Sequence, residues 1–297
     1  RGVNIFPYAP HLAFWQVAFA GLEKGALIVS TGGGKAMGTE RNIAAIAKLK
    51  PSFLIGVPGY IYHILRIAVE TKQDFSSIKK VVLGAEKVPL GLKQKMAELL
   101  NKLGAKDPYI IGTYGFTEAR LAWGECPAPL DKSSGYHTYP DLEIFECINP
   151  DTGETVGPGE SGEIVYSCID GRGSVVLRYR TGDLARGGIL YEPCPHCGRT
   201  VPRISSDLTR TSNIYGLEFS KVKGTLVNLN TFSQILNDQP EVEEWQIEIR
   251  KKNNDPFEVD ELIVYASVKP AVAAESFREN LLARFHAGSE VSPNEII

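Results

Sequence analysis

From residue 11 to about residue 113, two kinds of hydrophobic pattern alternate along the chain. Apolar residues at helical spacing predict helices, and short runs rich in β-branched residues predict buried strands. The expected helices are residues 11–24, 39–49, 60–70 and 89–103, and the expected strands are residues 26–30, 53–57, 81–83 and 109–111. This alternation predicts an α/β unit with a parallel sheet. Ligands bind such sheets at the carboxyl ends of the strands, where we expect the loops 31–34, 84–86 and 112–118 to gather.

After Gly124 the pattern changes to short strands separated by turns rich in Gly, Pro and Asp. Expected strands at 141–148, 162–167, 175–179 and 189–191 indicate a small β-barrel-like subdomain. From about Gly224 the expected elements are strand 225–227, helix 232–237, strands 244–250 and 261–267, and helix 274–285. That order suits a small α+β domain lacking its last pieces. We therefore expect an α/β subdomain over 1–123, a β-rich subdomain over 124–206, a hinge over 207–223 and a partial C-terminal domain over 224–297.

Composition restricts the class of protein. The 297 residues are enough for about two folding units, and the mixture of 43% hydrophobic and 23% charged residues is that of an ordinary globular protein. A net charge of −3, from 32 basic and 35 acidic residues, gives no broad attraction to nucleic acid or to anionic membranes. No apolar run approaches the roughly 20 residues of a transmembrane helix, and residues 1–7 lack a signal-peptide pattern. We expect a cytoplasmic protein whose partners are small molecules, with a homodimer left open.

Two short motifs carry the candidate chemistry. In residues 113–118, Thr-Tyr-Gly-Phe-Thr-Glu, Tyr114 could stack on a base and Glu118 could hold a magnesium ion beside phosphates. A strand-ending turn with a helix-capping threonine explains these residues equally well. In residues 178–183, Arg-Tyr-Arg-Thr-Gly-Asp, we expect Asp183 to be an exposed carboxylate at a strand end, suited to the hydroxyls of a ribose. An ordinary β-turn is the alternative for this segment.

Together, in this order and about 60 residues apart, the motifs resemble Tyr-Gly-x-Thr-Glu and Tyr-Arg-Thr-Gly-Asp of the adenylate-forming superfamily. Two further segments, Gly-Ala-Glu at 84–86 and Cys-Pro-His-Cys-Gly-Arg-Thr at 194–200, resemble the phenylacetate-coenzyme A ligases. The resemblance covers roughly residues 8–230. It implies a ligase core followed by part of a lid domain. It also implies that ATP activates a carboxylic acid, such as an aryl acid, as an acyl-adenylate, and that the acyl group passes to coenzyme A.

The resemblance also implies roles for individual residues. Its nucleotide-binding positions are Gly84, Ala85, Glu86, Tyr114, Gly115, Asp183 and Arg210, and its catalytic positions are Thr117 and Glu118. Tyr114 and the 84–86 loop contact adenine, Thr117 contacts phosphate, Glu118 ligates Mg²⁺ and Asp183 binds the ribose. Its acyl-pocket positions are His11, Phe14, Trp15, Tyr60 and Gly84, and we expect Gly32 and Gly33 to form a wall of the same pocket. Core packing is the alternative for these aromatic residues, and a plain tight turn is the alternative for the glycines.

The hinge and both ends depart from the family pattern. Relatives show Gly-Arg-x-Asp-Asp where residues 209–213 read Thr-Arg-Thr-Ser-Asn, so the second half-reaction is in doubt, although residues 221–224 resume the pattern. We find no phosphate loop upstream and no Gly-Lys near the end that could supply an adenylation lysine. We therefore expect a chain truncated at both ends, which alone neither adenylates nor forms a thioester. An enzyme using another acyl acceptor, or none, is the nearest alternative.

Five cysteines indicate metal binding more than disulfides in this setting. Cys194 and Cys197 have the spacing of a zinc knuckle, and Cys126 and His137 could complete four ligands, with His196 as a rival to His137. Such a zinc site would be structural, because no position is left open for water. Unligated cysteines are the alternative, and a zinc-stabilised, non-catalytic nucleotide-binding module stays open as a function. We expect the remaining two cysteines, Cys147 and Cys168, to be small buried residues.

Overall fold

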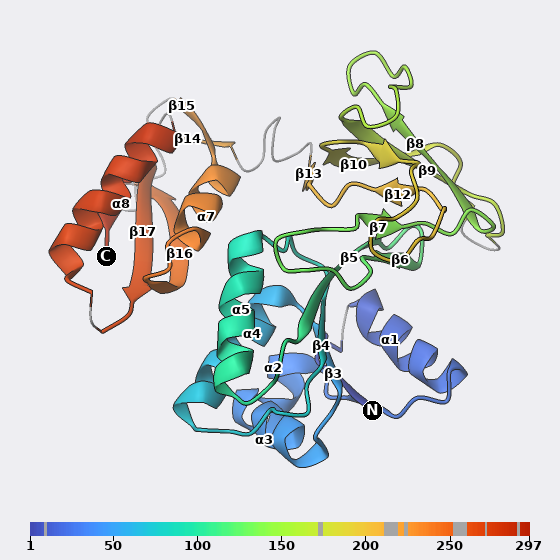
Figure 1. The fold of residues 1–297 in the computed structure, drawn as a ribbon. Coiled ribbons are helices and arrows are strands. Elements are labelled where there is room, and N and C mark those ends of the chain that lie inside the picture. The colour runs from blue at the N-terminus through green and yellow to red at the C-terminus, as the bar shows by residue number, and fades with distance from the viewer. Residues whose placement is uncertain are drawn as a thin grey trace. The chain divides into compact units, whose positions relative to one another are not determined.

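The computed structural model describes residues 1–8, 11–171, 175–210, 219–222, 225–251, 260–270, 272–289 and 292–297 (Figure 1). The chain divides into two compact units, residues 1–208 and residues 209–297. Among the described helices, none is both long and apolar enough to cross a membrane.

The first unit contains a six-stranded sheet in the order β2-β1-β3-β4-β5-β6. Its strands are β1 (Gly2–Asn4), β2 (Ile28–Ser30), β3 (Phe53–Gly56), β4 (Lys80–Leu83), β5 (Tyr109–Phe116) and β6 (Leu121–Gly124). Neighbours from β2 through β5 run parallel, whereas β6 folds back antiparallel on β5. The expected parallel sheet is confirmed, but the hydrophobic pattern did not reveal β1 or the hairpin.

Five helices accompany this sheet (Figure 1). They are α1 (Leu12–Glu23), α2 (Gly33–Met37), α3 (Thr39–Leu49), α4 (Pro58–Glu70) and α5 (Leu90–Lys102). Proline sets two of the starts: Pro58 occupies the first turn of α4, and Pro89 directly precedes α5. The expectation of a loop over 31–34 was partly wrong, because the short helix α2 begins at Gly33. Gly32, with φ of 77°, supplies the left-handed turn into it.

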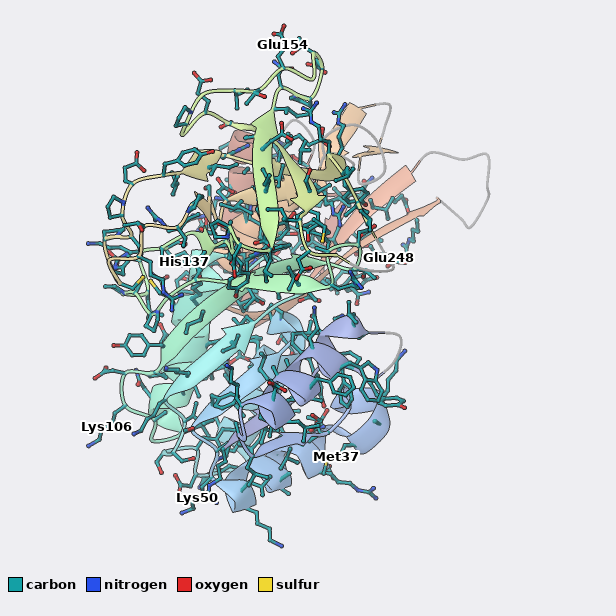
Figure 2. All side chains as sticks on the ribbon, turned by 90° about the vertical axis from the view of Figure 1, so that its right-hand side faces the viewer. Met37, Lys50, Lys106, His137, Glu154 and Glu248 are labelled. Carbon is teal, nitrogen blue, oxygen red and sulfur yellow. The ribbon has the colours of Figure 1, made fainter. Side chains whose placement is uncertain are left out.

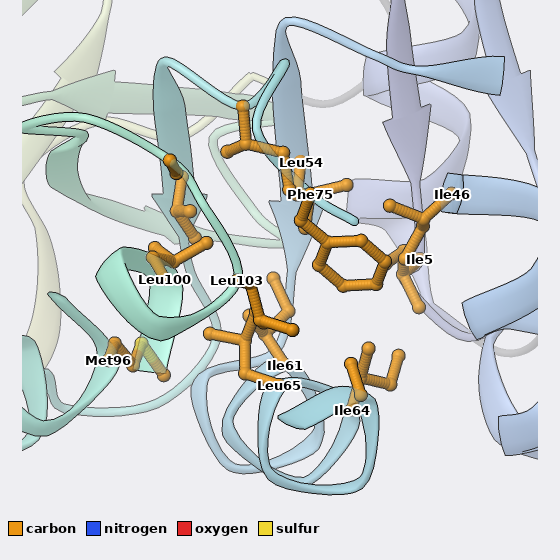
Figure 3. Packing of buried hydrophobic residues seen from close by; sticks show 14 of the residues in the cluster. Ile5, Ile46, Leu54, Ile61, Ile64, Leu65, Phe75, Met96, Leu100 and Leu103 are labelled. Atoms are coloured by element: carbon orange, nitrogen blue, oxygen red, sulfur yellow. The ribbon is translucent and has the colours of Figure 1, made fainter. Parts of the chain in front are cut away.

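A continuous hydrophobic core joins these helices to the sheet. Leu54 of β3, Ile61 and Leu65 of α4, and Leu100 of α5 are completely buried, and Phe75 packs among them from the loop after α4 (Figure 3). Each such side chain contributes about 1.5–3 kcal/mol on burial. The core therefore holds the strand ends, and the loops that leave them, on a close-packed support.

The β-rich part of this unit has two sheets. A four-stranded sheet, ordered β13-β10-β9-β8, is formed by β8 (Glu143–Ile148), β9 (Gly162–Cys168), β10 (Tyr179–Ala185) and β13 (Leu208–Arg210). A three-stranded sheet is formed by β11 (Ile189–Leu190), β12 (Arg203–Ile204) and β7 (Tyr136–His137). The strand expected at 175–179 was wrong: β10 starts where that segment was expected to end. Trp123, Tyr166 and Ile204 are fully buried in a core shared by the hairpin and both sheets.

The second unit follows the expected strand–helix–strand–strand–helix order. Its elements are β14 (Phe219–Val222), β15 (Thr225–Asn228), α7 (Leu229–Asn237), β16 (Val242–Lys251), β17 (Asp260–Val268), α8 (Ala274–Gly288) and β18 (Glu295–Ile296). A sheet ordered β16-β17-β18 supports the two helices, which meet where Phe232 stacks on Phe285 at a centroid distance of 4.5 Å. β15 is the strand expected at 225–227, whereas β14, with which it forms a hairpin, and the strand β18 were not expected.

Candidate functional site

The two sequence motifs meet in the structure. The Tyr114 hydroxyl on β5 donates a hydrogen bond of 2.7 Å to Oδ2 of Asp183 on β10, although 69 residues separate them. The Tyr114 ring is held by contacts with Phe116, Trp123 and Tyr136 at centroid distances of 5.6–5.8 Å. The expectation of an exposed Asp183 at a strand end was wrong, since the residue is 6% exposed and lies within β10. Tyr114 likewise lies within β5, not in a loop after it.

A β-bulge explains how Asp183 lies inside a strand with its carboxylate turned to Tyr114. The register of β10 against β9 shifts between Arg180 and Leu184, and Gly182 takes φ of 73°. The Thr181 hydroxyl donates to the Ile164 carbonyl at 2.8 Å, and the Asp183 amide donates to that hydroxyl at 3.1 Å.

Buried Glu163 completes this support. It accepts the Gly182 amide at 3.1 Å and the Arg180 guanidinium at 2.8 Å. Three residues of the Arg-Thr-Gly-Asp sequence thus serve mainly to place the fourth.

The second carboxylate lies in the turn between β5 and β6. Glu118 and Thr117 are exposed there, and the Arg120 amide closes the turn on the Thr117 carbonyl at 3.1 Å. The Tyr179 hydroxyl donates a 2.7 Å hydrogen bond to Glu118 Oε1. Carboxylate and hydroxyl oxygens are the donors that Mg²⁺ prefers, so the residues of this turn fit the expected ion chemically.

Gly115 is needed where β5 and β6 approach. A Cβ at this position would lie 2.8 Å from the Leu121 carbonyl oxygen, which is closer than side chains tolerate. The glycine of the Tyr-Gly-x-Thr-Glu motif therefore has a structural role in the hairpin that presents Glu118.

The loop at 84–86 lies directly against β5. A Cβ on Gly84 would be 2.5 Å from Oγ1 of Thr113, whose hydroxyl donates to the Leu83 carbonyl at 2.9 Å. Ala85 takes the left-handed φ of 75°, and Glu86 Oε2 accepts the Gly59 amide at 3.2 Å. The structure thus brings the loop beside the strand that carries Tyr114, as the expected adenine site requires.

A buried ion pair lies next to β5, the strand that carries Tyr114, and was not expected from the sequence. Lys93 Nζ of α5 donates to Glu125 Oε2 at 2.9 Å, and their side chains are only 10% and 5% exposed. The same oxygen accepts the Gly112 amide at 2.6 Å, and Ser133 donates to Oε1. The sequence did contain a signal for a buried lysine, because Lys93 lies at helical spacing from the buried residues Met96, Ala97 and Leu100 of α5.

The pair lines a pocket of about 150 Å³ between α5 and the segment after β6. Its lining also includes Val88, Gly112 and Tyr136. Burial, with the nearby Glu125 carboxylate, raises the pKa of the Tyr136 hydroxyl well above its usual range. The phenol is therefore neutral at physiological pH.

Five of the candidate acyl-pocket residues lie around Tyr8 and Asn42. Tyr8 contacts the rings of Phe14 and Trp15 at 5.3 and 5.4 Å, and its Cβ is 3.3 Å from the position that a Cβ on Gly32 would take. Asn42 Nδ2 donates to the Gly33 carbonyl and to the Tyr60 hydroxyl, both at 3.3 Å.

The remaining two candidates, His11 and Gly84, both lie near Phe6. His11 stacks on Phe6 at 5.4 Å, and the tip of the Phe6 ring faces Gly84. Trp15 is 39% exposed and stacks on Phe19. The structure therefore brings the candidates into one neighbourhood, with Trp15 at its solvent side.

Four residues form a candidate metal centre in the β-rich part. Ligand atoms of Cys126, His137, Cys194 and Cys197 all lie within 4.8 Å of one another. The Cys126 and Cys194 sulfurs are 3.6 Å apart, and the Cys197 sulfur is 3.4 Å from His137 Nε2. Tetrahedral zinc with ordinary bond lengths requires about 3.8 Å and about 3.6 Å for such pairs. The geometry therefore fits zinc, and the fit includes His137 and not His196.

Other groups prepare these ligands. His137 Nδ1 lies 3.3 Å from the Gly124 carbonyl, an arrangement that leaves Nε2 free for a metal. Burial raises the pKa of the Cys194 thiol, but hydrogen bonds from the backbone N–H groups of His196 and Cys197, together with those from the Cys126 and Cys197 side chains, lower it to about 6. Figure 2 shows His137 between Lys50, at the end of α3, and Glu154, at a tip of the β-rich part.

The remaining candidates are Arg210, the other hinge positions and the two cysteines outside the metal cluster. Arg210 is exposed at the end of β13. The hinge positions 211–213 and positions 223–224 lie outside the described residues. Cys147 is buried, as expected, and burial raises its thiol pKa to about 11, whereas Cys168 is only partly buried.

Comparison with known proteins agrees with this geometry. The family described as AMP-binding enzyme matches residues 3–178, more than half of the chain. A phenylacetate-coenzyme A ligase of Thermus thermophilus is 28% identical over 279 residues, which cover 92% of this chain and 55% of that protein. Another, of Aromatoleum evansii, is 30% identical over 193 residues, which cover 63% of this chain and 40% of that protein. The chain spans about half the length of the curated relatives it matches.

A solved structure extends the likeness in fold to the whole chain. The crystal structure of 2-hydroxyisobutyryl-CoA ligase in the postadenylation state, in complex with 2-HIB-AMP, covers 100% of this chain and 61% of its own, with a TM-score of 0.78. At 19% identity this likeness concerns the fold alone. The family match and the meeting of the two motifs lead to one conclusion: the chain belongs to the AMP-binding enzymes of the adenylate-forming superfamily.

Proposed function

We propose that the protein uses ATP to activate a carboxylic acid as an acyl-adenylate and transfers the acyl group to coenzyme A. The observation that carries this proposal is the meeting of the two motifs, in which Tyr114 binds Asp183 and Tyr179 binds Glu118. A nucleotide site needs an aromatic wall, a ribose acceptor and a metal ligand near one another, and these residues supply all three. The family assignment favours an enzyme over the non-catalytic module that the sequence left open.

In this proposal, different residues contact the base, the ribose and the phosphates of one ATP molecule. The base lies between Tyr114 and the 84–86 loop, and the ribose hydroxyls donate to Asp183. Thr117 and Glu118 face the phosphates, where Glu118 would hold Mg²⁺, whose charge neutralises the phosphate oxygens. An oxygen of the substrate carboxylate attacks the α-phosphorus, and pyrophosphate leaves. The coenzyme A thiol then attacks the acyl carbon, its proton is released, and AMP leaves.

We further propose an aryl acid, such as a phenylacetate-like acid, as the substrate. The aromatic residues Phe14, Trp15 and Tyr60, with Gly32 and Gly33, would form walls suited to a flat ring. The names of the curated relatives point the same way. The test is carboxylate-dependent ATP–pyrophosphate exchange by the full-length protein with matched panels of aryl and aliphatic acids. Equal rates with both panels would contradict the aryl assignment, and the absence of exchange with any acid would contradict adenylation.

A second candidate, transfer to an acceptor other than coenzyme A, is favoured by the hinge sequence. Residues 209–213 keep the arginine of the family pattern but replace both acids. Pyrophosphate release and thioester formation should therefore be measured with and without coenzyme A. Turnover that continues while no thioester appears would favour this second candidate.

We propose that Cys126, His137, Cys194 and Cys197 bind a structural zinc ion. Their ligand atoms all lie within 4.8 Å of one another, and protein would fill all four positions of a tetrahedral site. Metal analysis of protein purified without chelator should give about one equivalent, and less than about half would count strongly against the site. His137→Ala should lose zinc and His196→Ala should keep it. Cys194→Ser should lower stability more than nucleotide affinity, with Cys168→Ser as the matched control.

A further inference from the structure

We propose that Tyr179 is a positioning residue for Glu118 and sets the Mg²⁺ concentration at which the protein binds ATP tightly. This inference rests on the proposed function, which makes Glu118 the magnesium ligand. It goes further in assigning a task to the tyrosine of the second motif, to which the proposed function gives no role of its own.

The first observation is the crossed arrangement of the motifs. Tyr114 of the first motif binds the carboxylate of the second, and Tyr179 of the second binds the carboxylate of the first, each at 2.7 Å. Only the second of these hydrogen bonds reaches the carboxylate proposed to hold the ion. We therefore expect the Tyr179 hydroxyl, and not the Tyr114 hydroxyl, to affect how ATP binding depends on the Mg²⁺ concentration.

The second observation is the difference in support between donor and acceptor. Tyr179 belongs to the four-stranded sheet, where it pairs with Tyr166 of β9, and its ring lies 6.0 Å from that of Phe116. Glu118 lies in an exposed turn and has a long side chain with several rotamers. A hydroxyl fixed by the sheet therefore restrains a carboxylate that stands on a flexible side chain in an exposed turn.

The hydrogen bond also orients the carboxylate. Oε1 accepts the Tyr179 hydroxyl, so the direction in which the carboxylate faces depends on this bond. Partners of this kind, which orient a metal ligand from behind, typically alter metal affinity by about 10- to 100-fold when removed. Because this site is exposed, we expect the lower end of that range.

The test is calorimetric titration of ATP, without acid substrate, into the full-length protein over a series of Mg²⁺ concentrations and in EDTA. Tyr179→Phe keeps the ring and removes the hydroxyl, and it should need about tenfold more Mg²⁺ for half of the gain in affinity. Its affinity in EDTA should match that of the wild type. Tyr191→Phe, which alters an exposed tyrosine of the same unit, is the matched control and should leave the Mg²⁺ series unchanged.

A second variant separates positioning from simple loss of structure. Glu118→Asp keeps the charge but shortens the side chain, so it should break the bond to Tyr179 and raise the Mg²⁺ requirement. Adding Tyr179→Phe to it should then have no further effect.

An additive double variant would overturn the proposal, as would a Tyr179→Phe effect that is equal with and without Mg²⁺. If Tyr179→Phe behaves as wild type while Glu118→Ala shifts the Mg²⁺ series, this inference fails alone. If Glu118→Ala shifts nothing, the assignment of Glu118 in the proposed function fails with it.

Discussion

Lys93→Met should destabilise the first unit by leaving the Glu125 carboxylate buried without its cation. The change keeps a long, flexible and apolar side chain in α5, so it adds no cavity of consequence. Glu125 would retain the Gly112 amide and the Ser133 hydroxyl as donors, but neither carries a full charge. The perturbation therefore removes one charge and little else.

The magnitude follows from the burial of the pair. Removing one partner of a buried ion pair typically costs about 3–5 kcal/mol. The side chains of Lys93 and Glu125 are only 10% and 5% exposed, so solvent screening warrants no large discount. The two remaining donors lessen the cost, and we expect about 3 kcal/mol, which is a large part of the roughly 5–15 kcal/mol that stabilises a domain.

Urea denaturation followed by circular dichroism measures this loss. Lys102→Met, at an exposed position of the same helix, is the control and should change stability by no more than about 0.5 kcal/mol. The double variant Lys93→Met/Glu125→Gln keeps an acceptor for Gly112 but removes the buried charge. It should recover at least about 1 kcal/mol relative to Lys93→Met. A single-variant loss below about 1 kcal/mol, or a double variant no more stable than the single, would refute the charge-burial reasoning.

Three further predictions concern the site and its supports. Asp183→Ala in the full-length protein should weaken ATP binding by about 1.5–3 kcal/mol, whereas Glu118→Gln at saturating Mg²⁺ should lower kcat more than it raises KM for ATP; steady-state kinetics that show both variants changing only KM for the acid would contradict these roles. Gly115→Ala should lower the melting temperature, measured by calorimetry, because its Cβ would lie 2.8 Å from a carbonyl oxygen of β6; an unchanged melting temperature would contradict this. Burial raises the pKa of Glu143, so the carboxyl group stays protonated to a higher pH in the folded state than in the unfolded state. The free energy of unfolding should therefore fall as pH rises from about 4.5 through the raised pKa. Glu143→Gln, which keeps an acceptor for Trp123, should remove this pH dependence when denaturation is measured over a range of pH.

Local hydrophobic patterns predicted the helices and strands whose conformation is determined by their own residues. The alternation of helices and strands through residue 111 follows from periodicity, and the second unit follows the order expected from its pattern. The four candidate zinc ligands were also chosen from spacing and residue type, and the structure brings their ligand atoms together. In these cases the chemistry of the side chains and their distance along the chain were sufficient.

Strand pairing accounts for most of what the sequence did not reveal. Tyr114 was placed in a loop and Asp183 at an exposed strand end because glycine and threonine are typical of turns. In the structure, β6 pairs with residues 113–116 and extends β5, and a bulge lets Gly182 remain within β10. Register depends on partners distant in sequence, so no local pattern could have predicted either result.

The crossed hydrogen bonds give the spacing within the motifs a physical reason. In each motif the tyrosine precedes the carboxylate by four residues, from Tyr114 to Glu118 and from Tyr179 to Asp183. A fully extended strand would place such residues about 13 Å apart, and the turn in one motif and the bulge in the other shorten that span. Each motif therefore contributes to both ends of the proposed nucleotide site, from Asp183, the proposed ribose acceptor, to Glu118, the proposed metal ligand. A change in either spacing would misplace a tyrosine at one end and a carboxylate at the other, so both ends of the nucleotide site should be lost together.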